Sequence, residues 1–217
     1  MNNWTYENFF YLTSKKLRIL KILDHYEIYK KIFNIKGDIV ECGVFKGASL
    51  IRLLTFRDLY ENSKKRKVYG FDAFGKFPRP KNKKILTKKN DTKFAKNHDT
   101  KIGIGISIQK LKHYINKKNI TNYQLIKGDV NKTVPDFIKK NKKIKIALLH
   151  LDLDIYEPTF NVLNYLYKYV VRNGIILLDD YSHIKGATKA INDFFKNKKI
   201  KINKASKFGR PYYIVKK

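Results

Sequence analysis

A chain of 217 residues, 43% of them hydrophobic, is long enough for one α/β domain with a sizeable core and requires no second domain. Its 48 basic and 18 acidic residues give a formal net charge of +30, but only seven of the basic residues are arginine, which is favoured for binding base edges and phosphates. We attribute the charge mainly to a composition rich in residues with A/T-rich codons, with a secondary attraction for anionic substrates such as nucleotide diphosphates, and expect no nucleic-acid partner.

The cysteine count and the apolar runs exclude further classes. Cys42 is the only cysteine, so an intrachain disulfide and a cysteine-based metal site are both excluded, and its place in an expected strand makes it a small buried residue. The N-terminus lacks the pattern of a secretory signal, and no apolar run approaches the roughly 18 residues of a membrane-spanning helix. We expect a soluble, cytoplasmic protein without membrane insertion.

Residues 1–35 are aromatic and have helical apolar spacing, which predicts two helices before the first strand. These helices either pack against the sheet or form a lid or a dimer face, and a homodimer is a further expectation. The next stretch predicts a strand at Ile39 and Val40 that ends in Glu41, a loop containing Gly43 and Gly47, and a helix over 48–59.

The spacing Glu-x-Gly-x-x-x-Gly differs from dinucleotide-binding and phosphate-binding loops. It resembles motif I of the class I S-adenosylmethionine (SAM) methyltransferases, in which the acid lies near the methionine ammonium and the glycines let the backbone approach the ligand. Phe45 stands where many members carry another glycine. The alternative is an ordinary strand-to-helix turn of another α/β protein. The resemblance implies cofactor-binding roles for Glu41, Gly43, Gly47 and Ser49.

A second expected strand, over 67–72, ends in Asp72, where an open α/β sheet presents groups to a nucleoside. A carboxylate there can accept both ribose hydroxyls, so we expect Asp72 to bind the ribose. Residues 79–101 are polar and lack periodicity, which predicts a mobile loop or a substrate lid. Ser107 is the expected N-cap of a helix over 108–117.

The third expected strand, over 122–129, ends in Asp129, which could reach the adenine or its surroundings. A short helix is expected to follow, with Thr133 as its N-cap and Pro135 in its first turn.

Residues 145–156 form a nearly continuous apolar run that ends in Asp152 and Asp154, as expected of a buried parallel strand. A helix to about residue 171 and a strand over 174–181 follow, and that strand ends in Asp179 and Asp180. Clustered carboxylates raise one another's pKa unless a cation lies among them, and an all-oxygen set favours Mg²⁺. The alternative is separate acids that cap helices and pair with lysines.

Four ordered segments together resemble the macrocin O-methyltransferase (TylF/MycF-like) family of SAM-dependent sugar methyltransferases: residues 41–49, 70–78, 151–159 and 178–187. The likeness covers about 37–217 and implies a Rossmann-like α/β fold with a mostly parallel seven-stranded sheet, whose last strands lie near 199–204 and 212–216. It implies a methyltransferase domain over 36–217 with a basic insert at about 79–104, preceded by a helical extension over 1–35. Mg²⁺ would be held by Asp152, Asp179 and Asp180.

The family implies methyl transfer from SAM to a sugar hydroxyl, on a sugar, nucleotide sugar, glycan or glycosylated natural product. Mg²⁺ would lower the pKa of vicinal hydroxyls. The candidates for the proton acceptor are Asp152, Asp154 and His183, whereas His150 is expected to be a packed strand residue and His25 carries no signal.

Three alternatives stay open. The net charge would suit an RNA methyltransferase, and Mg²⁺ with a diol would suit a catechol-type O-methyltransferase. The third alternative is a binding protein that keeps the fold but has no catalytic activity. Such a protein would be expected to lack Glu41, Asp72 or the Asp179–Asp180 pair, and all of these are present.

Overall fold

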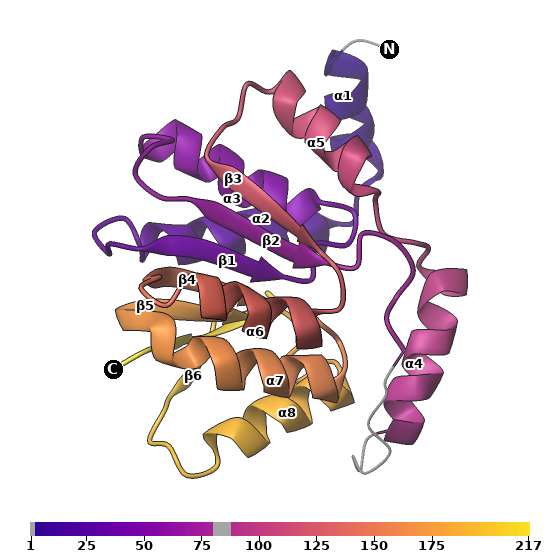
Figure 1. Ribbon diagram of the computed structural model, residues 1–217. Coiled ribbons are helices and arrows are strands. Elements are labelled where there is room, and N and C mark those ends of the chain that lie inside the picture. The colour runs from indigo at the N-terminus through magenta and orange to yellow at the C-terminus, as the bar shows by residue number, and fades with distance from the viewer. Residues whose placement is uncertain (1–2, 80–87) are drawn as a thin grey trace.

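The computed structural model describes residues 3–79 and 88–217 and contains a seven-stranded sheet in the order β3-β2-β1-β4-β5-β7-β6 (Figure 1). Strands β1 to β5 are parallel, and β7 is antiparallel to both β5 and β6. This arrangement confirms the predicted Rossmann-like fold. The strands are β1 (Asp38–Cys42), β2 (Val68–Asp72), β3 (Tyr123–Lys127), β4 (Ile146–Leu151), β5 (Val170–Leu178), β6 (Ile202–Lys204) and β7 (Tyr212–Val215).

Helices cover both faces of the sheet, and each face has its own apolar core. Val134, Leu163 and Ile191 contribute to the core under α6, α7 and α8, whereas Ile28 and Leu53 contribute to the core under α2 and α3. Because β4 lies in the middle of the sheet, all six of its residues are buried. The helices are α1 (Asn3–Thr13), α2 (Lys16–Lys30), α3 (Ala48–Tyr60), α4 (Lys88–Lys101), α5 (Ile108–Lys117), α6 (Val130–Lys140), α7 (Tyr156–Leu166) and α8 (Lys185–Phe195).

Of the two alternatives for residues 79–101, the mobile loop is wrong for Lys88–Lys101, which form α4, and the substrate lid stays a prediction. Residues 80–87 lie outside the described part of the chain. Long-range contacts hold this helix in place. Asp91 accepts a hydrogen bond from the backbone N–H of Tyr156 at 3.0 Å, and Asp99 accepts one from the backbone N–H of Phe77 at 2.9 Å. His98 packs against Phe77, with ring centroids 4.5 Å apart. Contacts of this kind leave no apolar period in the local sequence.

Two element boundaries also differ from expectation. Helix α6 begins at Val130, and its N-cap is Asp129 rather than Thr133, because the Asp129 side chain accepts from the backbone N–H of Asn131 at 3.0 Å. Helix α7 ends at Leu166 rather than near residue 171, and a 3-10 turn over Tyr167–Tyr169 leads directly into β5. The predicted N-cap Ser107 is confirmed, since its side chain accepts from the backbone N–H of Lys110. Among the described residues, no helix has the length and apolarity needed to span a membrane.

Candidate active site

A cavity of about 570 Å³ opens at the edge of the sheet where the parallel strands end. Loops that follow β1 to β5 line it, together with the first turns of α2 and the loop before β7. This is the edge at which open α/β sheets bind ligands, and the volume suits a small-molecule site.

The loop after β1 approaches the end of β4 so closely that it has no room for a side chain at Gly43. Gly43 has φ +97°, and a Cβ there would lie 1.7 Å from the carbonyl oxygen of Asp152. Phe45, where many family members carry glycine, also adopts a left-handed conformation, with φ 49°. The loop therefore keeps a glycine-like path without a glycine at 45, and Gly47, with φ +87°, leads into α3.

Asp72 lines the cavity and fixes this loop at the same time. One carboxylate oxygen accepts from the backbone N–H groups of Val44 and Phe45 at 3.0 and 2.9 Å, and the other accepts from Phe74 at 2.6 Å. Burial raises the pKa of Asp72 although these hydrogen bonds oppose the shift. Its contact with a ribose stays a prediction, and so does the role of Asp129, which lines the cavity from the N-terminus of α6.

Glu41 lies behind the loop rather than on the cavity surface. Its side chain is fully buried, and the Ser49 hydroxyl donates a hydrogen bond to it. His150 of β4 places its Nδ1 atom 3.4 Å from the same carboxylate. The SAM contacts predicted for Glu41 and Ser49 stay predictions, and what the structure adds is a polar link from Glu41 to β4.

The structure brings together the three acids predicted to hold a metal. Asp152, which follows β4, and Asp179 and Asp180, which follow β5, each offer an oxygen atom within 4.8 Å of the others. Burial and the neighbouring aspartates raise the pKa of Asp152 and Asp180 well above the ordinary value. Such mutual repulsion is what a bound divalent cation relieves, so this donor set fits Mg²⁺.

Asp154 stands at the border of this group. Its backbone N–H donates to the Asp180 carboxylate at 2.8 Å, while its own side chain lines the cavity. Burial, together with the charges of Asp152 and Asp179, raises the pKa of Asp154 to about 8. His183 also lines the cavity but is exposed and belongs to neither metal-binding group found among the described residues.

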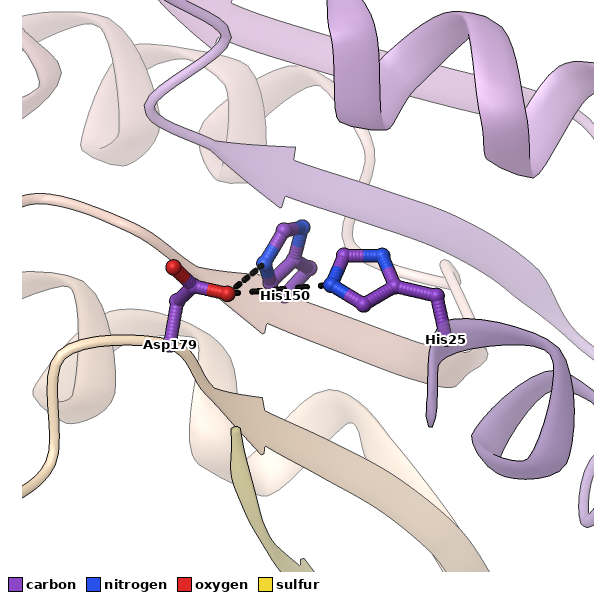
Figure 2. A group of neighbouring side chains, drawn as sticks. All are labelled: His25, His150 and Asp179. Carbon is purple, nitrogen blue, oxygen red and sulfur yellow. Dashed lines mark ion pairs between the residues drawn. The ribbon is translucent and has the colours of Figure 1, made fainter. Parts of the chain in front are cut away.

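Two histidines that the sequence did not mark as functional meet at Asp179 (Figure 2). His25 of α2 and His150 of β4 are both fully buried, and their Nε2 atoms lie 3.7 and 3.8 Å from the same Asp179 oxygen. Lys21 of α2 donates to the other Asp179 oxygen at 2.7 Å. Burial alone would raise the pKa of Asp179, but the two imidazoles and Lys21 outweigh it and hold the pKa well below its usual range.

Several polar atoms of this cluster have no hydrogen-bond partner among the described residues: His25 Nε2, Glu41 Oε2, both ring nitrogens of His150 and Asp179 Oδ1. Buried polar atoms without partners are costly, and their concentration beside the three acids is typical of a functional site. One sequence signal could have pointed to His150, because it precedes Asp152 by two residues on one strand. No local signal marks His25, which reaches Asp179 across the fold.

The strand order and the glycine loop that faces a carboxylate-lined edge define the class I methyltransferase fold. The model of the macrocin-O-methyltransferase (TylF) family matches residues 18–206, a range that includes all four segments of the resemblance. The chain belongs to this family.

One curated relative is the demethyldecarbamoylnovobiocin O-methyltransferase of Streptomyces niveus, 25% identical over 165 residues. The match covers 74% of this chain, and the chain spans about 59% of that relative's length. Two structures of CalS11, a calicheamicin methyltransferase described as a TDP-rhamnose 3'-O-methyltransferase, superpose on this chain with TM-scores of 0.78 and 0.70. Both are 23% identical to it, and each superposition covers 99% of this chain and 86% of the CalS11 chain. The O-methyltransferase NovP superposes with a TM-score of 0.75 at 20% identity, covering 90% of this chain and 79% of its own.

Proposed function

We propose that this protein transfers the methyl group of SAM to a sugar hydroxyl with the assistance of Mg²⁺. The observation that carries the proposal is the contact between the two halves of the cavity. The Asp152 backbone N–H donates to the carbonyl of Cys42 at 2.9 Å, so the glycine loop and the first acid of the three-carboxylate group are adjacent. The named activities of the relatives, which include methyl transfer to TDP-rhamnose by CalS11, support a sugar acceptor.

Asp152, Asp179 and Asp180 would hold the metal, which when bound lowers the pKa of vicinal hydroxyls. Lys21 and the two imidazoles keep Asp179 ionised and fix its orientation. SAM supplies the methyl group from its sulfonium. Gly43 leaves room for the Asp152 carbonyl, and Asp72 holds the shape of the loop that would face the cofactor.

During transfer the S–CH₃ bond breaks, an O–CH₃ bond forms, and the hydroxyl proton must leave the acceptor. Asp152, Asp154 and His183 are the candidate acceptors that line the cavity. We assign the proton to Asp154, because its carboxylate lines the cavity and lies outside the three-acid group that would hold the metal.

A thermal-shift series with S-adenosylhomocysteine (SAH), alone, with Mg²⁺ and with EDTA, tests this proposal. SAH at about 100 times its dissociation constant should add roughly 2.7 kcal/mol of stability. Mg²⁺ should add a separate shift that EDTA removes. In the Asp179→Ala variant the Mg²⁺ shift should disappear while the SAH shift remains, each measured against that variant's own unliganded melting temperature.

Asp136→Ala is the matched control, because Asp136 is an exposed aspartate of α6 whose side chain is 67% accessible. It should keep both shifts. The absence of any SAH response in the wild-type protein would contradict the methyltransferase assignment, and an SAH response without a Mg²⁺ response would remove the metal from the mechanism.

A further inference from the structure

Arginine is scarce in this chain, and its distribution is uneven. The chain carries far more lysines than arginines, yet three of its seven arginines line the active-site cavity. These three, whose side chains are exposed, are Arg18, Arg79 and Arg210. Arg57 and Arg66 are instead buried and donate to backbone carbonyls. A planar guanidinium binds phosphate through two parallel hydrogen bonds, which the lysine ammonium cannot do.

The three cavity arginines differ in their partners. Arg79 forms an ion pair with Asp99 at 3.5 Å. Arg18 and Arg210 form no ion pair with any described residue, although several carboxylates line the same cavity. Lys21, by contrast, is paired with Asp179 at 2.7 Å. The acids of the site have therefore left two guanidinium groups available to a ligand.

Both available arginines belong to segments that lie close to the three-acid group. Because Leu178 pairs with Tyr212, Arg210 stands two residues before β7 at the height where Asp179 and Asp180 leave β5. Arg18 precedes Lys21 by three residues on α2 and therefore shares its helix face.

Arg18 and Arg210 also come from neighbouring segments. The loop before β7 touches α2, since a Cβ built on Gly209 would lie 1.9 Å from an Asp24 carboxylate oxygen. Asp24 and Arg18 belong to the same helix, and both line the cavity. The two arginines therefore come from adjoining segments, and both segments reach the three-acid group: α2 through Lys21, and the loop before β7 through its pairing with the end of β5.

We infer that the acceptor is a nucleoside diphosphate sugar, with its diphosphate bound by Arg18 and Arg210 and its sugar hydroxyls directed toward Asp152, Asp179 and Asp180. This inference rests on the proposed function and narrows its acceptor to an anionic class. The acids suit vicinal hydroxyls around a cation, whereas the arginines suit phosphate oxygens. An uncharged glycoside would leave both guanidinium groups without a partner.

The test measures binding of UDP, dTDP and uridine by calorimetry to the SAH-saturated protein. EDTA is present so that no metal bridges the phosphates, and the salt is held near physiological strength because the net charge of +30 attracts any anion. UDP or dTDP should bind at least about tenfold more tightly than uridine. Arg18→Gln and Arg210→Gln should each weaken diphosphate binding by about tenfold and leave SAH binding unchanged.

Arg172→Gln is the matched control, because Arg172 is an exposed arginine near the start of β5, outside the cavity. It should leave diphosphate binding unchanged. Equal affinity for UDP, dTDP and uridine would overturn the inference, and so would an Arg172 variant that loses as much diphosphate affinity as the Arg18 and Arg210 variants. If SAH still binds in either case, the methyltransferase proposal stands. A short single-stranded RNA that binds more tightly than either diphosphate would overturn it in favour of an RNA acceptor. Failure of SAH to bind would instead remove the proposed function itself.

Discussion

At the residue scale, the carboxylates of the cavity differ in charge because their neighbours differ. Asp179 stays ionised beside two imidazoles and Lys21, whereas burial and like charges raise the pKa of Asp152 and Asp180 well above the ordinary range. Burial likewise raises the pKa of Asp154, to about 8. Without a cation the site therefore holds protons near neutral pH, and Mg²⁺ binding should release them.

We predict that the EDTA-treated protein loses stability as the pH rises from 6.5 to 8. Asp154 has a folded pKa of about 8 against an ordinary value of 3.8, so the folded state binds more protons than the unfolded state and stability falls with pH. Burial lowers the pKa of His25 from 6.5 to about 3, so its opposite contribution fades over about one pH unit above 6.5. His150 reinforces the effect of Asp154, because its burial is outweighed by the carboxylates of Asp179 and Glu41, which raise its pKa to about 10. Each group protonated only in the folded state contributes up to about 1.4 kcal/mol per pH unit.

Melting temperatures across this pH range provide the measurement, and about 1 kcal/mol corresponds to about 2–4 °C in a chain of this length. Asp154→Asn should reduce the slope, because the amide does not titrate. Saturating Mg²⁺ should also reduce it. A melting temperature that rises with pH in EDTA would contradict the assignment of raised pKa values.

The sequence was sufficient to predict that three aspartates lie together at one edge of the sheet, but not which buried side chains contact them. Asp152, Asp179 and Asp180 each follow a strongly apolar strand, and the parallel strands β4 and β5 end at one edge. His25 could not be predicted in this way, because it reaches Asp179 from a helix whose docking depends on the whole core. The contact between Glu41 and His150 likewise joins two strands, so the glycine motif alone does not predict it.

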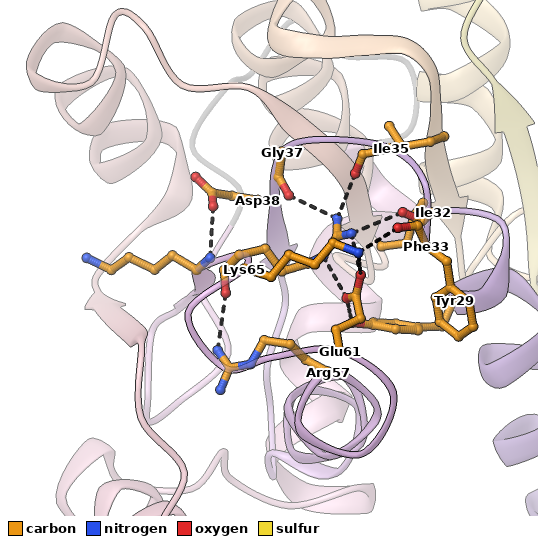
Figure 3. A network of polar contacts seen from close by, with 11 residues as sticks. Tyr29, Ile32, Phe33, Ile35, Gly37, Asp38, Arg57, Glu61 and Lys65 are labelled. Atoms are coloured by element: carbon orange, nitrogen blue, oxygen red, sulfur yellow. Dashed lines mark hydrogen bonds and ion pairs between the residues drawn. The ribbon is translucent and has the colours of Figure 1, made fainter.

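At the element scale, the connection between α2 and β1 is fixed by a buried guanidinium group. Arg66 is 2% exposed and donates to the carbonyls of Ile32, Ile35 and Gly37 at 3.0, 3.2 and 2.9 Å, and its ion pair with Glu61 measures 2.7 Å. These acceptors converge on one point at the end of α3 (Figure 3). The network holds α2 on the sheet and so supports the placement of its active-site residues.

We predict that Arg66→Ala lowers the free energy of unfolding by about 3–5 kcal/mol, since it leaves the buried Glu61 carboxylate and three carbonyls without their donor. Urea or thermal unfolding provides the measurement. Arg172→Ala is the control, and as an exposed substitution it should change stability by no more than about 0.5 kcal/mol. Equal effects of the two substitutions would show that the network contributes nothing beyond surface charge.

Helices with apolar periodicity could be predicted from sequence, whereas α4 could not. Helix α5 has a predicted N-cap and a strong apolar stripe that includes Leu111 and Ile115, and its observed bounds match the expected ones. Helix α4 is mostly polar and depends on contacts with other elements, including Tyr156 and Phe77. Its helical state follows from tertiary structure, so local patterning predicted a loop.

At the scale of the whole molecule, α1 leaves apolar side chains uncovered in a chain with a net charge of +30. Five large residues of this helix are 57–84% exposed: Trp4, Tyr6, Phe9, Tyr11 and Leu12. A contiguous exposed apolar surface usually marks an interaction site. Helix α1 also leads directly to Lys15, which lines the cavity. A protein surface that packs on α1 would therefore lie at the entrance of the active site.

We predict that α1 is the interface of a homodimer and that dimerisation strengthens with salt. Two copies that each carry +30 repel one another, and added salt screens this repulsion without weakening apolar contacts. Light scattering coupled to size-exclusion chromatography should give a dimer whose fraction rises between roughly 0.05 and 0.5 M salt. An RNA complex would show the opposite trend, because salt weakens phosphate contacts.

Replacing Trp4, Phe9 and Leu12 together by serine should give a monomer that still binds SAH, because these side chains contribute to neither core. Leu59→Ser is the matched control: Leu59 is 69% exposed on α3, and its loss should leave the dimer intact. A wild-type protein that stays monomeric at high salt would exclude the dimer. Helix α1 would then act within one chain, and the triple variant should instead weaken acceptor binding, as expected of a lid beside Lys15 and Arg18.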